Sequence, residues 1–580
     1  MKLKTYTIIF CIALFTGTMA FAQNDSTLNK QVEVIKAYQP DINDAYKLGR
    51  TPVISDTNTY VPAFDYRIHS SSIPVNKNIN HLPVVQLGTP PRAGSNTGYA
   101  KAGIGNALST YGELLLNSSP ARNTDFGMHL YHFSSRPQIK PIGDEKVKAP
   151  YSNSLAKIFV KNDFRKSTLQ WDLAYQRDRI NFYGMAPGDT LSQLFHENHT
   201  PGYNDLHASN RASALVNLKN TYNRAALDYQ LIFDYDYLWN TSQQQAHKAG
   251  YQGIFSNDQR DYQLKLDTRF DFFQQSNIRH YFIDSLTARH FFLAGLTPQF
   301  EIKRNNIELK AGFNLDALVN PDSAMLWNIA PKVYFAYHPI KGMLTIFAGS
   351  DGGIAPNNYY QARKQNPFLD PLVDVQPSQE LVNLYGGFKG KISRKVSYLF
   401  DLAYSMKLNT PLYFLSEVQG SDTSYHNRFT PVYDDINTLR FGAKLRYSST
   451  GLNIELKGNY YVYEAQKLDI LPHMPAYDAS LVSAFKLNNK IRATLNATLI
   501  GPRDGGYLIN SFTSTGEPIQ RFHPLLLDPI IDVNMEVTYQ YSQALSFFIN
   551  ARNLLNQKRA FYTGYPQQGL MIMLGATFTF

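Results

Sequence analysis

The sequence predicts an all-β protein, a large antiparallel transmembrane β-barrel of about 22 strands preceded by a short extended segment. Three observations predict this fold. The chain starts with a secretory signal, apolar and polar side chains alternate over most of 98–580, and an apolar strand ends at Phe580. Such a strand at a chain end is typical of barrels, because its outer face meets lipid and both of its edges are paired.

The first residues have the features of a signal peptide. Lys2 and Lys4 give a positive start, 8–15 is apolar, and Ala20-Phe21-Ala22 is a small-residue cleavage site. The single cysteine lies inside this segment, so the exported chain would carry no disulfide and no cysteine-based metal site. The predicted organisation has three parts: a signal peptide at 1–22, a short proline-containing periplasmic or lumen segment at 23–95, and an outer-membrane barrel at 96–580.

The composition narrows the class. Aromatic residues make up 13% of the chain, with 39 Tyr and 36 Phe, while charged residues make up only 18%. After the signal, no apolar stretch is long enough for a membrane-spanning helix. The net charge of +10 comes without a basic stripe or a helical reading motif, so no nucleic acid is expected as a partner. A large secreted β-sandwich or propeller is the competing fold class.

Several segments separate an apolar face from a charged one by strict alternation. The clearest are 307–317, 452–459, 491–499 and 531–540. A packed sandwich core could not hold these charges unpaired, so the polar face is either solvent-exposed or lines a wet lumen. We expect these lumen charges to pair across neighbouring strands.

Connection lengths favour a barrel, because outer-membrane barrels have short turns on one rim and long loops on the other. Short turns are predicted at 305–306, 339–342, 488–489 and 542–543. Long loops are predicted at 136–150, 183–206, 242–259, 354–379, 415–433 and 501–527. Counting 279–284 as a short strand gives about 22 strands, and the count without this weak region is about 20. A barrel near 22 strands needs its lumen filled.

The end of the chain carries a recognisable pattern. Asn553-Leu554-Leu555-Asn556 is followed by Tyr562-Thr563-Gly564-Tyr565-Pro566, Gly569 and a last strand that ends in Phe. This stretch resembles the C-terminus of TonB-dependent outer-membrane receptors. Asn366-Pro367-Phe368-Leu369, with Gln376-Pro377-Ser378-Gln379-Glu380 after it, is similar to a stretch that these receptors carry before a barrel strand. The resemblance implies a receptor barrel in the outer membrane of a Gram-negative bacterium.

The N-terminal part departs from that family. Its receptors carry a globular plug between signal and barrel, whereas only 23–92 is available here, with seven prolines from Pro40 to Pro91. We expect this segment to be mostly extended. Within it, Val32, Glu33, Val34 and Ile35 resemble a TonB box, which could add a strand to a periplasmic partner's sheet. The alternative is that these side chains pack inside the barrel mouth or on its rim.

No catalytic motif is found, so no enzyme activity, cofactor or metal site is expected. His196, His199 and His207, near Glu197 and Asp205, follow no defined metal spacing and are expected to be ordinary loop residues. Tyr359, Tyr360, Arg363 and Lys364 form a candidate external ligand loop, since aromatic rings beside cations suit glycans or anions. The alternatives are interface aromatics, or a loop folded inward that constricts the lumen.

Together these features predict an outer-membrane transporter or receptor that moves a ligand through a gated lumen. The expected partners are membrane lipid and a TonB-type periplasmic protein or another envelope protein that fills the lumen. The alternative function is a non-transporting structural or assembly subunit of an outer-membrane complex. The sequence does not identify the ligand.

Overall fold

A computed structural model describes residues 98–580 apart from 122, 142–145, 185–200, 223–226, 281–282, 321–324, 420–423 and 513–517. Of the 24 strands in its main sheet, β22 and β23 form a hairpin that joins β17 by only two parallel residue pairs. The other 22 close an antiparallel barrel, which confirms the predicted fold and strand number. The signal peptide, the 23–95 segment and Val32–Ile35 lie outside the described residues. Within the described residues, no helix has the length and apolar character needed to cross a membrane.

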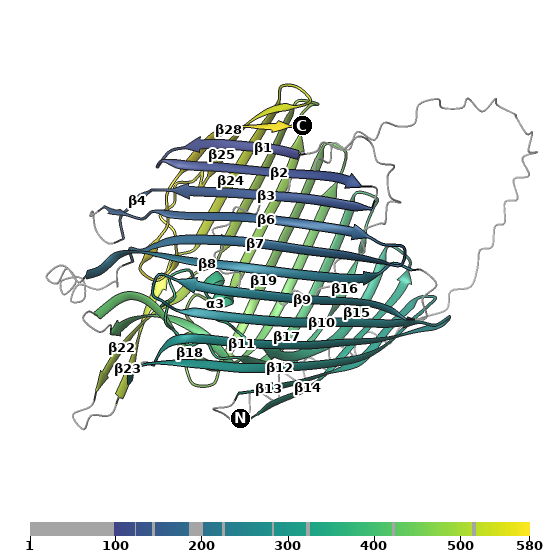
Figure 1. Ribbon diagram of the computed structural model, residues 1–580, viewed down its shortest axis with the longest axis horizontal. Coiled ribbons are helices and arrows are strands. Elements are labelled where there is room, and N and C mark those ends of the chain that lie inside the picture. Colours follow the sequence, from purple (N-terminus) through teal and green to yellow (C-terminus); the bar gives the residue numbers. More distant parts are fainter. Residues whose placement is uncertain are drawn as a thin grey trace, which may run out of the picture. The chain divides into compact units, whose positions relative to one another are not determined.

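The barrel strands follow one another in chain order around the wall (Figure 1). They are β1 (Gly98–Gly105), β2 (Ser109–Ala121), β3 (Thr124–Ser135), β6 (Tyr151–Asp163), β7 (Ser167–Phe182), β8 (Pro201–Asn220), β9 (Asp228–Asn240), β10 (Gln245–Asp258), β11 (Tyr262–His280), β12 (Ile283–Arg304), β13 (Ile307–Val319), β14 (Leu326–Ile340), β15 (Leu344–Ala355), β16 (Ser378–Lys391), β17 (Val396–Gln419), β18 (Ser424–Ser448), β19 (Leu452–Ala465), β20 (Tyr477–Lys486), β21 (Ile491–Ile500), β24 (Ile530–Gln540), β25 (Leu545–Arg552) and β28 (Met571–Thr579). The remaining elements belong to the connections: β4 (Gln138–Ile139), β5 (Val147–Lys148), α3 (Tyr359–Gln365), β22 (Arg503–Phe512), β23 (Pro518–Leu527), β26 (Ala560–Tyr562) and β27 (Tyr565–Pro566).

The barrel closes between its first and last strands. β1 pairs with β28 from Tyr99↔Thr579 to Gly105↔Met573, and Gly98 and Phe580 exchange two backbone hydrogen bonds of 3.0 Å. The apolar terminal strand therefore has a paired neighbour on each side, β25 and β1. Its outward side chains, such as Leu574 at 55% exposure, face away from the lumen, as the alternation predicts.

The two rims differ in their connections. The rim that holds residues 98 and 580 carries only short turns, and we call it the short-turn rim. The predicted turns at 305–306, 339–342, 488–489 and 542–543 all lie there, and each overlaps a gap between strands. The opposite, long-loop rim carries the connections 136–150, 356–377, 501–529 and 553–570. This asymmetry is the one expected for an outer-membrane barrel, with short turns on the periplasmic side.

The two faces of the wall differ as the alternation predicts. Outward positions carry exposed apolar side chains, whereas inward positions carry ion pairs across strands. Lys310 Nζ lies 3.1 Å from Glu301 on the neighbouring strand, and Lys444 Nζ lies 2.8 Å from Glu455. The expected pairing of lumen charges is thus observed at these positions.

Three predicted segments were wrong. The stretch 242–259 is not a loop but contains β10, and 279–284 is not a separate strand but the meeting point of β11 and β12. These two errors cancel in the strand count. The stretch 415–433 is mostly strand, because β17 and β18 run past the barrel wall to Gln419 and Ser424. The sequence pattern does not reveal β10 because Gly250 and Gly253 interrupt its alternation of apolar and polar side chains. A Cβ at Gly250 would lie 2.4 Å from Asp234 Oδ1, so a larger residue there would displace this lumen carboxylate.

Candidate functional site

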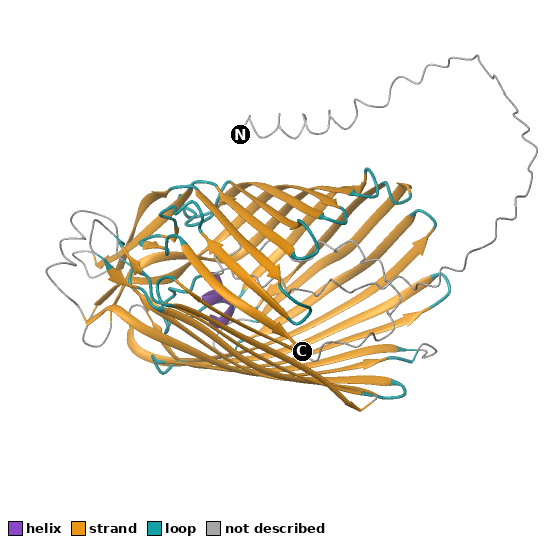
Figure 2. Ribbon diagram, turned by 90° about the horizontal axis from the view of Figure 1, so that it is seen from above, coloured by secondary structure: helices purple, strands orange, loops and turns teal. Residues whose placement is uncertain are grey.

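Connections of the long-loop rim fold into the barrel and form an apolar core inside it. Figure 2 shows α3 surrounded by the strands of the wall. Most of the core side chains come from the connections 136–150, 356–377 and 553–570, and the others come from the long-loop ends of wall strands, from Tyr183 and from β22. We call the inward-folded parts of these three connections the loop plug. Its buried members include Ile139, Val147, Tyr359, Phe368, Leu369, Tyr562 and Tyr565, which pack with Phe429 of β18.

Tyr565 lies at the centre of this core. It is fully buried, its ring centroid lies 3.7 Å from that of Phe368 in a stacked arrangement, and Tyr183 meets it edge-on at 5.1 Å. Its hydroxyl donates to the carbonyl of Asn427 in β18. A Cβ at Gly184 would lie 2.2 Å from the Tyr565 ring, so glycine is needed for this close approach. The aromatic stack therefore joins residues from four separate parts of the chain.

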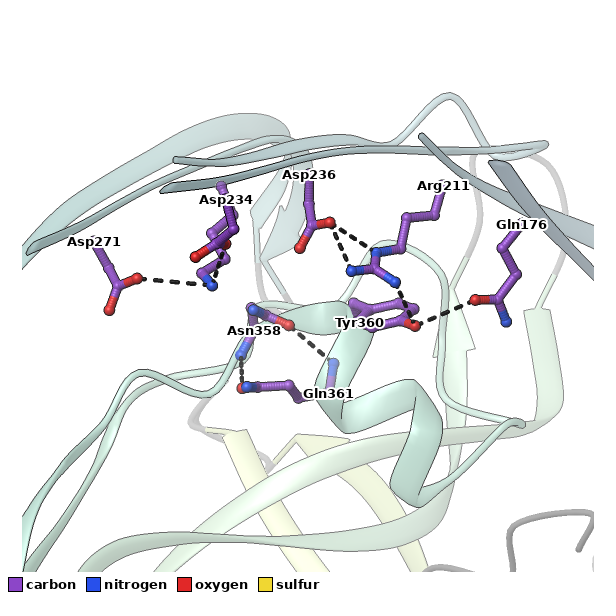
Figure 3. Close-up of polar contacts among 9 residues, drawn as sticks. Gln176, Arg211, Asp234, Asp236, Asp271, Asn358, Tyr360 and Gln361 are labelled. Atoms are coloured by element: carbon purple, nitrogen blue, oxygen red, sulfur yellow. Dashed lines mark hydrogen bonds and ion pairs between the residues drawn. The ribbon is translucent and has the colours of Figure 1, made fainter. Parts of the chain in front are cut away.

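The sequence around α3 explains why a short helix forms there. Asn358 Oδ1 accepts a hydrogen bond from Gln361 N at 2.9 Å, and Asn358 N donates to Gln361 Oε1 at 3.4 Å, which completes a capping box (Figure 3). Arg363 and Lys364 occupy the last turn, where cations favour the helix dipole. The helix ends before Pro367, because the residue before a proline avoids helical geometry. Tyr359 and Ala362 face the loop-plug core.

The other side of α3 contacts the charged wall through Tyr360. The Tyr360 hydroxyl accepts from Arg211 Nη1 at 3.1 Å and donates to Gln176 Oε1 at 3.4 Å (Figure 3). The Arg211 guanidinium also lies 4.4 Å from the ring centroid, and Lys364 Nζ lies at the same distance from it. Arg211 in turn binds Asp236 of β9 at 2.6 Å. One tyrosine thus connects the helix to the strands β7, β8 and β9.

A second set of charges flanks this contact. Lys248 Nζ lies 2.7 Å from Asp234 and 3.7 Å from Asp271, all on wall strands. Arg289 of β12 reaches across to Asp374 of the 356–377 connection, with an N–O distance of 2.8 Å. Between α3 and the wall is a cavity of about 40 Å³, enough for two or three water molecules. The side of α3 that faces the wall is therefore polar and borders a small cavity, while the side that faces the core is apolar and tightly packed.

A partly buried histidine joins the 466–476 and 553–570 connections. His473, between β19 and β20, accepts the backbone N–H of Thr563 at Nε2, at 3.1 Å. Accepting at Nε2 requires the neutral imidazole. Burial, and secondarily the Arg503 guanidinium, lowers the pKa of His473 to about 3. This ring is therefore held neutral at ordinary pH.

The fold on which these features are built has solved relatives. The ferripyoverdine receptor of the Pseudomonas aeruginosa outer membrane matches over 85% of this chain and 72% of its own, with 11% identity and a TM-score of 0.61. The FrpB iron transporter from Neisseria meningitidis matches over 84% and 82%, with 10% identity and a TM-score of 0.62. The ferric-catecholate import receptor Fiu from E. coli K12 also matches over 84% and 82%, at 13% identity and a TM-score of 0.58. This barrel has the fold of the TonB-dependent receptors.

The receptor fold confirms the resemblance seen in the sequence and the outer-membrane location. The identities are low, and the searches of family models and of curated proteins each found no match. These solved proteins are themselves named as receptors and a transporter.

In this receptor fold, the four residues of the candidate ligand loop lie on α3 inside the barrel. Tyr359 and Arg363 are buried, Tyr360 faces the charged wall, and Lys364 is exposed with its ammonium over the Tyr360 ring. Their role in ligand binding stays a prediction. Of the histidines considered for metal, His207 is buried, and its Nδ1 lies 2.9 Å from Thr241 Oγ1. His196, Glu197 and His199 lie outside the described residues, and among those described no three His, Cys, Asp or Glu side chains form a metal-binding group.

Sequence reasoning missed the wall partners of the loop plug. Alternation predicts that Gln176 and Asp236 point into the lumen, but not which connection they meet. The N-x-x-Q spacing of Asn358 and Gln361 before Arg363 and Lys364 is a helix-start signal that could have located α3.

Proposed function

We propose that this chain is a gated outer-membrane receptor that transports its ligand, and that the loop plug is its gate. The observation that carries the proposal is the position of α3, which is packed on one side against the aromatic core and bonded on the other to the charged wall. A barrel of this width needs its lumen filled. Here the long-loop connections supply the filling.

The difference between the two sides of α3 suggests which of its contacts breaks first when the gate opens. The wall side consists of hydrogen bonds and ion pairs beside a small cavity, and polar contacts of this kind can be exchanged for water or ligand groups at low net cost. The core side buries aromatic surface that would have to stay covered. We infer that opening separates Tyr360 from Arg211 and moves α3 together with its aromatic core.

The names of the solved relatives, an import receptor and an iron transporter among them, support transport as the class of activity. Energy supplied by a TonB-type partner would act through Val32–Ile35, the predicted TonB-box segment. The ligand would enter from the long-loop rim, which is the external side if short turns face the periplasm.

Planar-bilayer conductance tests the proposal. The full-length barrel should be closed, and a variant with 357–376 replaced by a Gly/Ser linker should show large open channels. A variant with the turn 392–395 on the short-turn rim replaced in the same way should remain closed, because it lacks contact with the loop plug. A further variant without 23–92 tests whether that segment also blocks the lumen.

Two results would contradict the gate. Large conductance of the full-length barrel would mean that the loop plug does not close the lumen. No conductance of any variant, together with stable co-purification of another envelope protein, would favour the alternative function of a structural or assembly subunit.

A further inference from the structure

The outward face of β3, β6, β7 and β8 changes polarity abruptly near the long-loop rim. These strands are consecutive neighbours in the wall (Figure 1). One cross-strand row of outward side chains is apolar or aromatic: Leu130, Ala156, Tyr175 and Ala212. The next row toward the long-loop rim is polar: His132, Ser154, Arg177 and Asn210. Two residues along each strand therefore separate apolar or aromatic side chains, which suit lipid, from polar side chains, which suit water.

The polar region continues one row further on β3, β6 and β7, whereas the partner of Arg179 on β8 is the buried Ala208. There Ser134, Ser152 and Arg179 are register partners, and Thr110 of β2 lies beside Ser134 with its hydroxyl oxygen 2.7 Å away. In the row below, His132 Nδ1 lies 2.8 Å from the hydroxyl oxygen of Ser154. Two arginines are thus bordered on one side by hydroxyl groups that can accept or donate hydrogen bonds.

Arg177 and Arg179 are the cations of this region. Both are exposed, and neither has an ion pair or a hydrogen bond with the residues that the structure describes. They lie two residues apart on one face of a strand, so their guanidinium groups project in the same direction. Nothing in the described wall neutralises them.

The neighbouring aromatic side chains are of the kind that gathers at the edge of a membrane. Tyr175, just below Arg177, donates its hydroxyl to Asn210 at 2.8 Å, and its ring lies 6.1 Å from that of Trp239. Trp239 stacks on Tyr237 at 5.0 Å. Tyrosine and tryptophan gather at the interface, where the ring meets hydrocarbon and the polar group meets headgroups. An outward arginine is costly at the bilayer midplane but nearly free at this depth.

We propose that Arg177 and Arg179, with the hydroxyl side chains beside them, bind the phosphate groups of the outer-leaflet glycolipid. Guanidinium groups match phosphate geometry with two parallel hydrogen bonds, and the unpaired pair of charges supplies what an anionic headgroup needs. The acyl chains would then lie against Leu173 and Tyr175, which are exposed on the same face of β7. The assignment to the outer leaflet rests on the long-loop rim being external and does not depend on transport.

Binding of lipid A to the folded full-length barrel in nonionic detergent micelles tests this site. The probes are bisphosphorylated lipid A and the same glycolipid without phosphates, measured by native mass spectrometry of the bound fraction. We expect the phosphorylated form to bind more tightly to the unaltered protein. The variant Arg177→Gln/Arg179→Gln should weaken that binding by about 30-fold and leave the phosphate-free form unaffected.

Two further variants keep the result interpretable. Arg177→Lys/Arg179→Lys preserves the charge and should retain most of the binding, which shows that the site tolerates substitution. Arg394→Gln/Lys395→Gln removes two cations from a turn on the short-turn rim and should bind lipid A as the unaltered protein does. The heat-dependent gel shift verifies that each barrel is folded. Equal binding of lipid A by the Gln double variant and the unaltered protein, or equal binding of the two glycolipids by the unaltered protein, would overturn the proposal.

Discussion

Arg211 holds Tyr360 of α3 against the barrel wall by two contacts at once. Its Nη1 donates to the phenol oxygen at 3.1 Å, and its guanidinium carbon lies 4.4 Å from the ring centroid. The remaining nitrogens bind Asp236, with Nε at 3.0 Å and Nη2 at 2.6 Å. The ion pair between Arg211 and Asp236 belongs to the wall alone, so removal of the phenol should weaken the attachment of the helix and leave the wall intact. The ion pair of 3.8 Å between Arg363 and Asp178 of β7 remains in that variant.

Tyr360→Ala should therefore raise the open probability of the channel. Loss of the charge-assisted hydrogen bond from Arg211, the long hydrogen bond to Gln176 and the cation–π contact with Arg211 is worth about 1–2 kcal/mol, or roughly 5- to 30-fold in an open-to-closed equilibrium. Single-channel recording in planar bilayers measures this directly. Tyr541→Ala is the matched control, because Tyr541 is 64% exposed beside the short-turn rim. Equal open probabilities for the two variants would show that the Tyr360 contact does not hold the gate.

The aromatic centre of the loop plug should be its most sensitive point. Tyr565→Ala removes a fully buried ring that contacts Phe368, Tyr183 and Phe429. Such truncations cost about 3–5 kcal/mol. Limited proteolysis of the folded barrel should then cut the 356–377 connection much faster. Leu574→Ala, which truncates an outward side chain of β28, should leave the cleavage rate unchanged, and a similar rate in both variants would contradict the central role of Tyr565.

The barrel was predictable because its physical signal is local. Most strands show their lipid and lumen faces in their own sequence, as in Ile307–Val319, and the turns on the short-turn rim are short. The signal fails where one face loses side chains. In β10, Gly250 and Gly253 make room for Asp234 and Thr268 side chains, and the strand no longer alternates clearly.

The loop plug was not predictable in the same way, because its contacts join residues far apart in the chain. Tyr360 meets Gln176, and Tyr565 meets Tyr183 and Phe368, at sequence separations that no periodic pattern encodes. Alternation predicted which side chains of β7 and β9 enter the lumen. It could not tell whether those side chains meet water, a ligand or another part of the same chain.

His473 makes the loop plug sensitive to acid. Its pKa is lowered to about 3 in the folded state, whereas an exposed histidine titrates near 6.5. The open or unfolded form therefore binds the proton first, and stability is lost as the pH falls from about 6.5 towards 3. Between pH 7.5 and pH 5 the loss amounts to about 2 kcal/mol. Protonation at Nε2 would also remove the acceptor for the Thr563 N–H.

We expect the open probability of the channel, or proteolysis of the 466–476 connection, to increase when the pH falls from 7.5 to 5. His473→Gln is the control, since its amide oxygen can accept the Thr563 N–H but does not titrate in this range. The variant should therefore respond much less to pH. A variant that responds as strongly as the unaltered protein would assign the acid sensitivity to other groups.

The closure of the barrel should depend on an ion pair that crosses its seam, which is the junction between β1 and β28. Lys101 of β1 lies 3.4 Å from Glu536 of β24, across the two intervening strands β28 and β25, and both side chains are at least four-fifths buried. Asn550 donates to the same carboxylate at 2.9 Å, and the Lys101 ammonium lies 4.1 Å from the Phe548 ring centroid. Lys101→Met keeps the length and the ring contact but leaves Glu536 without this cation. Because the lumen is partly wet, we expect a loss of about 2 kcal/mol, below the full cost of breaking a dry ion pair.

Urea titration read by gel mobility of unboiled samples measures the loss. The double variant Lys101→Met/Glu536→Gln removes both charges, so it should recover most of the stability that Lys101→Met loses, as expected when an uncompensated buried charge is the cause. Glu536→Gln alone should cost less than Lys101→Met, because the freed ammonium still lies over the Phe548 ring. If the double variant unfolds at the same urea concentration as Lys101→Met, the seam is held by its backbone ladder and side-chain packing, and the ion pair contributes nothing measurable.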